Sequence, residues 1–127
     1  MPPRPGHSAK VTLTVTPEDT ALALGSGDVE VLATPRLVGL CEEAAVLSLS
    51  GQLPEDDTSV GLAVDLKHLA PSPIGSEVEA EARLDAVDGR KLTFTLKVSE
   101  GDNEIARGRH VRVIVNRGQF LERAGVK

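Results

Sequence analysis

The sequence predicts an α+β fold in which one antiparallel β-sheet wraps around a single long helix. One stretch that begins at Thr34-Pro35 is apolar nearly all the way round at helical spacing, which is typical of a buried helix. Several other stretches alternate apolar and polar residues with the period of two that indicates half-buried strands. The dipeptide Asp88-Gly89 lies between two of these stretches and predicts a β-hairpin turn.

The length of 127 residues fits one folded domain. We expect a loose, proline-rich tail at residues 1–9 and a single domain over residues 10–127. Hydrophobic residues make up 40% of the chain and charged residues 26%, which favours a folded, soluble protein over a disordered one. Phe94 and Phe120 are the only aromatic residues, so valine, leucine and alanine must fill the core.

Composition also excludes several classes of function. A net charge of -5 and the near absence of aromatic side chains argue against a nucleic-acid partner. The single cysteine, Cys41, excludes an intramolecular disulfide and a CxxC metal site. Phosphate-binding loops and metal-ligand spacings are absent, so we expect no metal and no cofactor. Residues 1–10 contain no apolar run and no stretch is suited to cross a bilayer, so we expect a cytoplasmic protein without a membrane anchor.

The first part of the chain predicts two strands and the helix. Residues 10–16 alternate as a half-buried strand, and residues 17–28 form a connection or flap that leads to a short strand at 29–32. Thr34 is expected to cap the helix and Pro35 to occupy its first position. The helix should run to about Leu49.

The second part predicts a long strand at 58–69, followed by strands at 76–87, 91–99 and 104–116, the last three in a meander. Strict alternation in the long strand places one set of side chains on one face and a second set on the other. The first set is Val60, Leu62, Val64, Leu66 and His68, and the second is Gly61, Ala63, Asp65 and Lys67.

A helix that is apolar on all sides needs cover on all sides, and one curved sheet covers it only in part. A second copy of the chain, related by a two-fold axis, would complete the cover. This is the hot-dog arrangement, and we expect a homodimer or a higher oligomer built from it.

Three polar residues do not fit the apolar pattern. His68 shares strand phase with apolar residues, although a histidine at a strand end that leans toward solvent would look the same. Glu42 and Glu43 are the only charges inside the apolar helix, so at least one should face protein, unless Glu43 is exposed and Glu42 lies at a partly wet dimer seam. Thr34 is explained by capping, although free amides at a helix start can also bind an oxyanion. Cys41 is expected to be a core residue.

Five segments resemble the fluoroacetyl-CoA thioesterase family, and the likeness covers roughly residues 31–124. They are Ala33–Glu42, Ser59–Gly61, Lys67–Gly75, Val87–Leu92 and Asn103–His110.

The resemblance implies a dimeric hot-dog fold that hydrolyses acyl-CoA thioesters. Carried over by position, the catalytic set is Thr34, Glu42 and His68, with Gly61 lining the substrate site and no metal. Coenzyme A then enters only as part of the substrate. The family's lid carries phenylalanines, whereas this chain has the aliphatic run Ala21–Leu24, so the prediction is an acyl-CoA of unspecified acyl group.

The implied mechanism has Glu42 attack the thioester or activate a water, with His68 assisting proton transfer and Thr34 positioning the partners. In a regular helix Thr34 and Glu42 are about 12 Å apart along the axis, so water or the second subunit must complete the set, or the helix must begin later. Two rival functions use the same fold. One is a module that binds acyl-CoA without cleaving it, and the other is an enoyl-CoA hydratase, which lacks an Asp/His pair because Asp65 and His68 have opposite strand phase.

Overall fold

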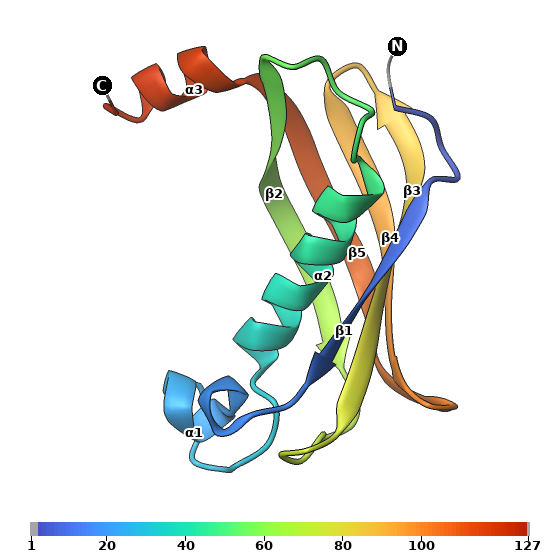
Figure 1. The fold of residues 1–127 in the computed structure, drawn as a ribbon, viewed down its shortest axis with the longest axis vertical. Coiled ribbons are helices and arrows are strands. Elements are labelled where there is room, and N and C mark those ends of the chain that lie inside the picture. The colour runs from blue at the N-terminus through green and yellow to red at the C-terminus, as the bar shows by residue number, and fades with distance from the viewer. Residues whose placement is uncertain (1–2, 127) are drawn as a thin grey trace.

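A five-stranded antiparallel sheet forms the framework of the protein (Figure 1). The computed structural model describes residues 3–126. The predicted tail and domain include Met1, Pro2 and Lys127, which lie outside the described residues. The strand order is β1-β3-β4-β5-β2, with strands β1 (Ser8–Thr14), β2 (Asp57–His68), β3 (Glu77–Asp88), β4 (Lys91–Glu100) and β5 (Asn103–Asn116).

Helix α2 (Thr34–Ser48) lies across the concave side of this sheet (Figure 1). It packs chiefly on β1 and β3. Its buried positions recur at the spacing of one helical face, and they meet the inward residues of β3 and β4, of which Phe94 is the largest. The residues that the helix buries are Leu37, Leu40, Cys41, Ala44, Ala45 and Ser48. The predicted α+β class, with one sheet curled around one long helix, is therefore confirmed.

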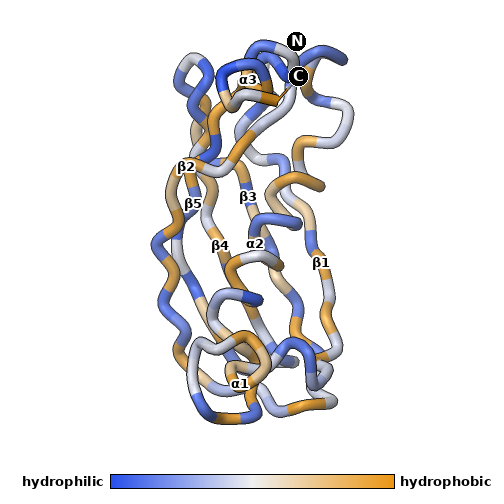
Figure 2. Tube along the Cα trace, turned by 90° about the vertical axis from the view of Figure 1, so that its left-hand side faces the viewer, coloured by the Kyte–Doolittle hydropathy of each residue, from blue (hydrophilic) through white to orange (hydrophobic). Residues whose placement is uncertain are grey.

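Strands β3, β4 and β5 form the predicted meander. Buried and exposed residues alternate along β3 and β4, and Figure 2 shows the same alternation as hydrophobic and hydrophilic bands. Gly89 and Gly101 adopt positive φ angles of 61° and 59° at the two hairpin turns, which a residue with a side chain rarely adopts. The turns thus fix the register that keeps the apolar face toward α2.

The start of α2 differs from the prediction. Ala33 is the N-cap and Thr34 is the first helical residue, with no side-chain cap at this end. Thr34 does not cap the helix because its hydroxyl is hydrogen-bonded to His68. The capping role predicted for Thr34 is therefore wrong. Its hydroxyl instead contacts a residue that is distant in the sequence.

The predicted strand at 29–32 does not form. Val31 and Leu32 take part only in isolated bridges. The preceding connection contains a single turn, η1 (Pro17–Asp19), and a short helix, α1 (Ala21–Leu24). The Val31 carbonyl accepts a 2.8 Å hydrogen bond from Ala21 N in the flap. Leu32 N donates a 2.8 Å hydrogen bond to Ser72 O in the loop after β2. These bonds occupy backbone groups of Val31 and Leu32 that pairing with a strand of the main sheet would need.

A short helix ends the described chain. Helix α3 (Arg117–Arg123) follows β5 directly, and the Asn116 side chain caps it by accepting a 3.0 Å hydrogen bond from Gln119 N. The sequence patterns predict no element after Asn116. No helix in the described part of the chain is long and apolar enough to cross a membrane.

A β-bulge in β2 corrects the predicted faces of this strand. The pairing with β5 skips Leu62, because Gly61 pairs with Arg112 and Ala63 pairs with Val111. The extra residue reverses the alternation on one side of the bulge. Gly61 and His68 therefore lie on the same inner face, and the prediction that strict alternation puts them on opposite faces is wrong.

Candidate active site

Thr34 and His68 meet at the N-terminal end of α2. Thr34 Oγ1 lies 2.8 Å from His68 Nδ1, although 34 residues separate them in sequence. The helix start supplies the hydroxyl and the last residue of β2 supplies the imidazole. The structure thus brings together two of the three residues that the resemblance assigns to catalysis.

Burial lowers the pKa of His68 below its usual value. The imidazole is therefore neutral at physiological pH. A neutral ring can accept the Thr34 proton at Nδ1, so this pair is able to move a proton.

An open pocket of about 320 Å³ adjoins this pair, and both Thr34 and His68 line it. The flap and the loop after β2 contribute most of its other residues, and these are small or aliphatic. Among them are Ala21, Val29, Val31 and Leu69. Such a wall suits a short, uncharged acyl group next to groups that can transfer a proton.

Glu42 lies further along α2 than Thr34, and its carboxylate is next to Gly61 of β2. A Cβ atom added at Gly61 would lie 2.6 Å from Glu42 Oε2, so only glycine leaves this carboxylate in place. The Glu42 side chain is partly exposed, and Arg112 Nη1 lies 3.5 Å from its Oε2. Glu43, by contrast, is exposed and forms an ion pair with Arg36 at 3.4 Å.

Arg112 is buried and held on three sides. Its Nε donates to Ser59 Oγ at 2.8 Å and its Nη2 donates to the Ser59 carbonyl at 2.9 Å. Its Nη1 lies 3.2 Å from His110 Nε2 as well as near Glu42. These contacts fix the guanidinium, and the guanidinium in turn orients the Glu42 carboxylate.

His110 is fully buried, and its two neighbours fix its tautomer. A carbonyl can only accept, so Nδ1 donates its proton to Ala63 O at 2.8 Å. A guanidinium can only donate, so Nε2 accepts from Arg112. Burial lowers the pKa of His110, which agrees with a neutral ring.

The three predicted catalytic residues do not converge within one chain. Helix α2 is regular from Thr34, so Glu42 lies about 12 Å further along the helix axis. Gly61, beneath Glu42, lies about 20 Å along β2 from His68. One subunit therefore presents a Thr34–His68 pair at one place and a Glu42–Arg112 pair at another.

Ser59, His110 and Arg112 are site residues that the sequence patterns do not predict. Their signal is faint, because His110 and Arg112 are simply two polar residues in phase on the inner face of a strand whose other inward residues are apolar. Cys41 matches its prediction, since it is fully buried and burial raises the pKa of its thiol to about 12, which makes it unreactive. Residues 3–126 contain no group of three or more His, Cys, Asp or Glu side chains placed to hold a metal ion.

A family model and a known relative assign this chain to the same family. A family model described as fluoroacetyl-CoA-specific thioesterase matches residues 15–118. A fluoroacetyl-CoA thioesterase from Streptantibioticus cattleyicolor is 35% identical over 91 residues, which cover 72% of this chain and 66% of that relative. The match thus spans slightly less than two thirds of the relative's length.

Solved structures extend the likeness to nearly the whole chain. A crystal structure of a point mutant of the fluoroacetyl-CoA-specific thioesterase has a TM-score of 0.89 at 30% identity, covering 96% of this chain and 95% of that one. A thioesterase superfamily member from Thermus thermophilus has a TM-score of 0.90 at 27% identity, covering 98% and 92%. A hot-dog-like protein from Thermanaerovibrio acidaminovorans has a TM-score of 0.87 at 25% identity, covering 95% and 90%.

Proposed function

Because the chain belongs to the fluoroacetyl-CoA-specific thioesterase family and has the hot-dog fold, we propose that it hydrolyses a small acyl-CoA thioester to the free acid and CoA. The observation that carries this proposal is the Thr34–His68 hydrogen bond beside an aliphatic pocket. The pocket accommodates the acyl group, and the neutral imidazole accepts a proton at the reacting centre.

The catalytic set is completed by a second subunit. Strand β2 is an edge of the sheet, since it pairs only with β5, and its free backbone groups can pair with another strand. If two copies pair their β2 strands about a two-fold axis, the strands run in opposite directions. The His68 end of one strand then approaches the half of the partner strand that contains Gly61, above which the partner's carboxylate equivalent to Glu42 lies.

The surface near β2 supports this dimer. Val46 and Leu47 on α2 are 51% and 52% exposed, and Leu62 and Val64 on β2 are 63% and 37% exposed. We call these four residues the α2–β2 seam. A helix predicted to be buried on all sides thus leaves apolar side chains exposed, as does the free edge strand, and a second copy would cover both sets.

In the complete site, Glu42 of one subunit activates a water that attacks the thioester carbonyl, or attacks the carbonyl itself, and the C–S bond breaks. Direct attack gives an acyl anhydride with Glu42, which a water then hydrolyses to the free acid and the Glu42 carboxylate. Thr34 and His68 of the other subunit carry the proton of the water to the CoA sulfur. Arg112 positions the carboxylate throughout. The sulfur of CoA leaves with a proton. The acyl group is small, because it has to fit beside Thr34 and His68 in a pocket that the flap residues also line.

The direct test is release of free CoA from a panel of short acyl-CoAs, followed with a thiol reagent. Wild-type protein should release thiol, and Glu42→Gln and His68→Ala should each lose most turnover while the circular dichroism spectrum stays unchanged. Thermal stabilisation by acyl-CoA without thiol release would support the rival reading, a binding module. Undiminished turnover in either variant would remove that residue from the mechanism.

Mixing these two inactive variants tests the shared site. A mixed dimer contains one site in which both residues are intact, so random reassociation should restore about one quarter of wild-type activity. Each variant alone, refolded in the same way, serves as the control. No recovery, with mixed dimers demonstrated by mass spectrometry, would place all three residues in one subunit.

A further inference from the structure

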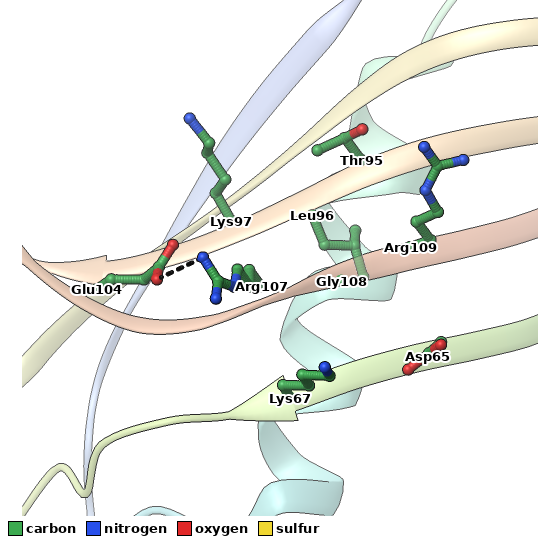
Figure 3. Close-up of a pocket in the computed structure, with 9 residues that line it drawn as sticks. All are labelled: Asp65, Lys67, Thr95, Leu96, Lys97, Glu104, Arg107, Gly108 and Arg109. Carbon is green, nitrogen blue, oxygen red and sulfur yellow. Dashed lines mark ion pairs between the residues drawn. The ribbon is translucent and has the colours of Figure 1, made fainter.

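A second pocket, of about 400 Å³, lies on the face of the sheet that points away from α2 (Figure 3). Strands β2, β4 and β5 supply its walls. Among its residues, Lys67, Lys97, Arg107 and Arg109 carry the positive charges and Asp65 and Glu104 the negative ones. The proposed hydrolytic site does not use any of these six side chains.

The cations in this pocket are placed close together. Arg107 on β5 is the register partner of both Lys67 on β2 and Lys97 on β4, so three cations lie side by side across three strands. Like charges directly opposite one another destabilise a sheet. Within the described residues, only Arg107 of the three makes an ion pair, with Glu104 at 3.5 Å. Lys97 also has an acidic register partner, Glu81 on β3, whereas both register partners of Arg107 are lysines and the one register partner of Lys67 is Arg107. This row of cations stands out in a chain whose net charge is -5.

We propose that this pocket binds the phosphate groups at the nucleotide end of the CoA thioester. The inference rests on the proposed function, because it assigns the other end of the same substrate. Arginine and lysine are the side chains that best recognise phosphate oxygens, through charge-assisted hydrogen bonds. A bound polyanion would also remove the repulsion within the row Lys67, Arg107 and Lys97.

The two sites are close enough in the fold to share one ligand. Lys67 and His68 are neighbours at the end of β2, and strand alternation directs them to opposite faces of the sheet. Strand β2 ends there, at the edge of the sheet, so a flexible chain can pass beside this strand end from one face to the other. The uncharged pantetheine arm of CoA joins the thioester to the phosphates and is such a chain.

Binding is tested by calorimetry with CoA, with 3′,5′-ADP and with pantetheine. The double variant Lys67→Gln/Lys97→Gln should bind CoA and 3′,5′-ADP about tenfold more weakly than wild type, with pantetheine unaffected. Lys10→Gln is the matched control, because Lys10 lies on the edge strand β1, is exposed, and does not line this pocket. Equal affinity of wild type and the double variant for CoA would overturn the proposal.

Kinetics separates this proposal from the hydrolytic one. With acetyl-CoA, the double variant should raise KM about tenfold and leave kcat unchanged, whereas with S-acetylpantetheine both constants should match wild type. An equal loss with both substrates would show damage to the reaction site instead and overturn the assignment. If no preparation hydrolyses either substrate, the hydrolytic proposal fails, and the calorimetry still decides whether the pocket binds the nucleotide.

A final comparison separates a nucleotide site from a general phosphate site. Inorganic phosphate should displace 3′,5′-ADP only at a large excess, because it lacks the second, separated phosphate. Displacement at equal concentration would reduce the pocket to a simple anion site and overturn the nucleotide assignment. Added salt should weaken CoA binding in wild type more than in the double variant, since it screens the exposed charges.

Discussion

His110 links the shape of β2 to the position of Glu42. Its Nδ1–H holds the Ala63 carbonyl, beside the bulge, and its Nε2 accepts from Arg112, which contacts Glu42. One neutral imidazole thus joins a backbone irregularity to a charged side chain. This connection explains why a histidine occupies a fully buried position.

The pH dependence of hydrolysis should report on His68. Burial lowers the pKa of this imidazole, so the neutral, proton-accepting form persists below the ordinary histidine value of about 6.5. The acid limb of kcat/KM should therefore fall below pH 6.5, and activity should be retained as pH rises through neutrality. A full pH–rate profile measures this, and an acid limb centred above pH 6.5 would contradict it.

Gly61→Ala should reduce kcat at least tenfold with little change in stability. The new methyl group would lie 2.6 Å from Glu42 Oε2, and the flexible carboxylate would move away more readily than the backbone. Gly39→Ala in α2 is the matched control, because the atom nearest to its added Cβ is Arg36 Nη1 at 3.9 Å. The control should keep full activity and raise the free energy of unfolding by about 0.5 to 1 kcal/mol. Urea denaturation and CoA release measure both quantities.

At the scale of elements, the bulge in β2 decides which residues face the site. It lets one strand direct both Gly61 and His68 toward α2. Ser59 also faces inward on the other side of the bulge from His68, where it holds Arg112. In a regular strand of the same length, either Ser59 and Gly61 or His68 would face outward.

Deletion of Leu62 should therefore abolish hydrolysis and destabilise the protein. The regular strand would move Ser59 and Gly61 to the outer face and remove the hydrogen bond of Ser59 Oγ to buried Arg112, at a loss of about 3 kcal/mol. Leu62→Ala keeps the bulge and the contact of Ser59 with Arg112. Because Leu62 is 63% exposed within one subunit, the free energy of unfolding of the separated subunit should stay within about 0.5 kcal/mol of wild type, although Leu62 belongs to the dimer seam. Wild-type activity in the deletion variant would show that the bulge does not position the site.

The same elements show what the sequence could predict. Periodicity located α2 and the meander because each buries one face, and that signal is local. It could not reveal the bulge, since Leu62 is apolar and fits strict alternation equally well. It also could not detect the contact of Thr34 with His68 or the burial of Arg112, because these depend on pairing between distant segments. The site residues therefore came from the resemblance, and their geometry came from the structure.

For the whole molecule, the α2–β2 seam should control assembly. Leu47→Lys places a charge in the seam and should convert dimers to monomers, with loss of hydrolysis because the two halves of the site separate. Leu121→Lys on α3 is the matched control, since Leu121 is 42% exposed and lies outside the seam. Sedimentation velocity and CoA release should show both changes together in Leu47→Lys only. A dimeric, inactive Leu47→Lys protein would argue against this interface.

The strand order β1-β3-β4-β5-β2 also governs how the chain can fold as it is made. Strand β2 is synthesised before three other strands, yet its only partner within the chain is β5, the last of them. Until β5 has left the ribosome, β2 has no partner strand within the chain. The pairing of β2 with β5 joins distant segments, which slows folding and leaves an apolar edge exposed meanwhile. Newly made chains are consequently most vulnerable to aggregation in the interval after β2 has been made and before β5 follows it.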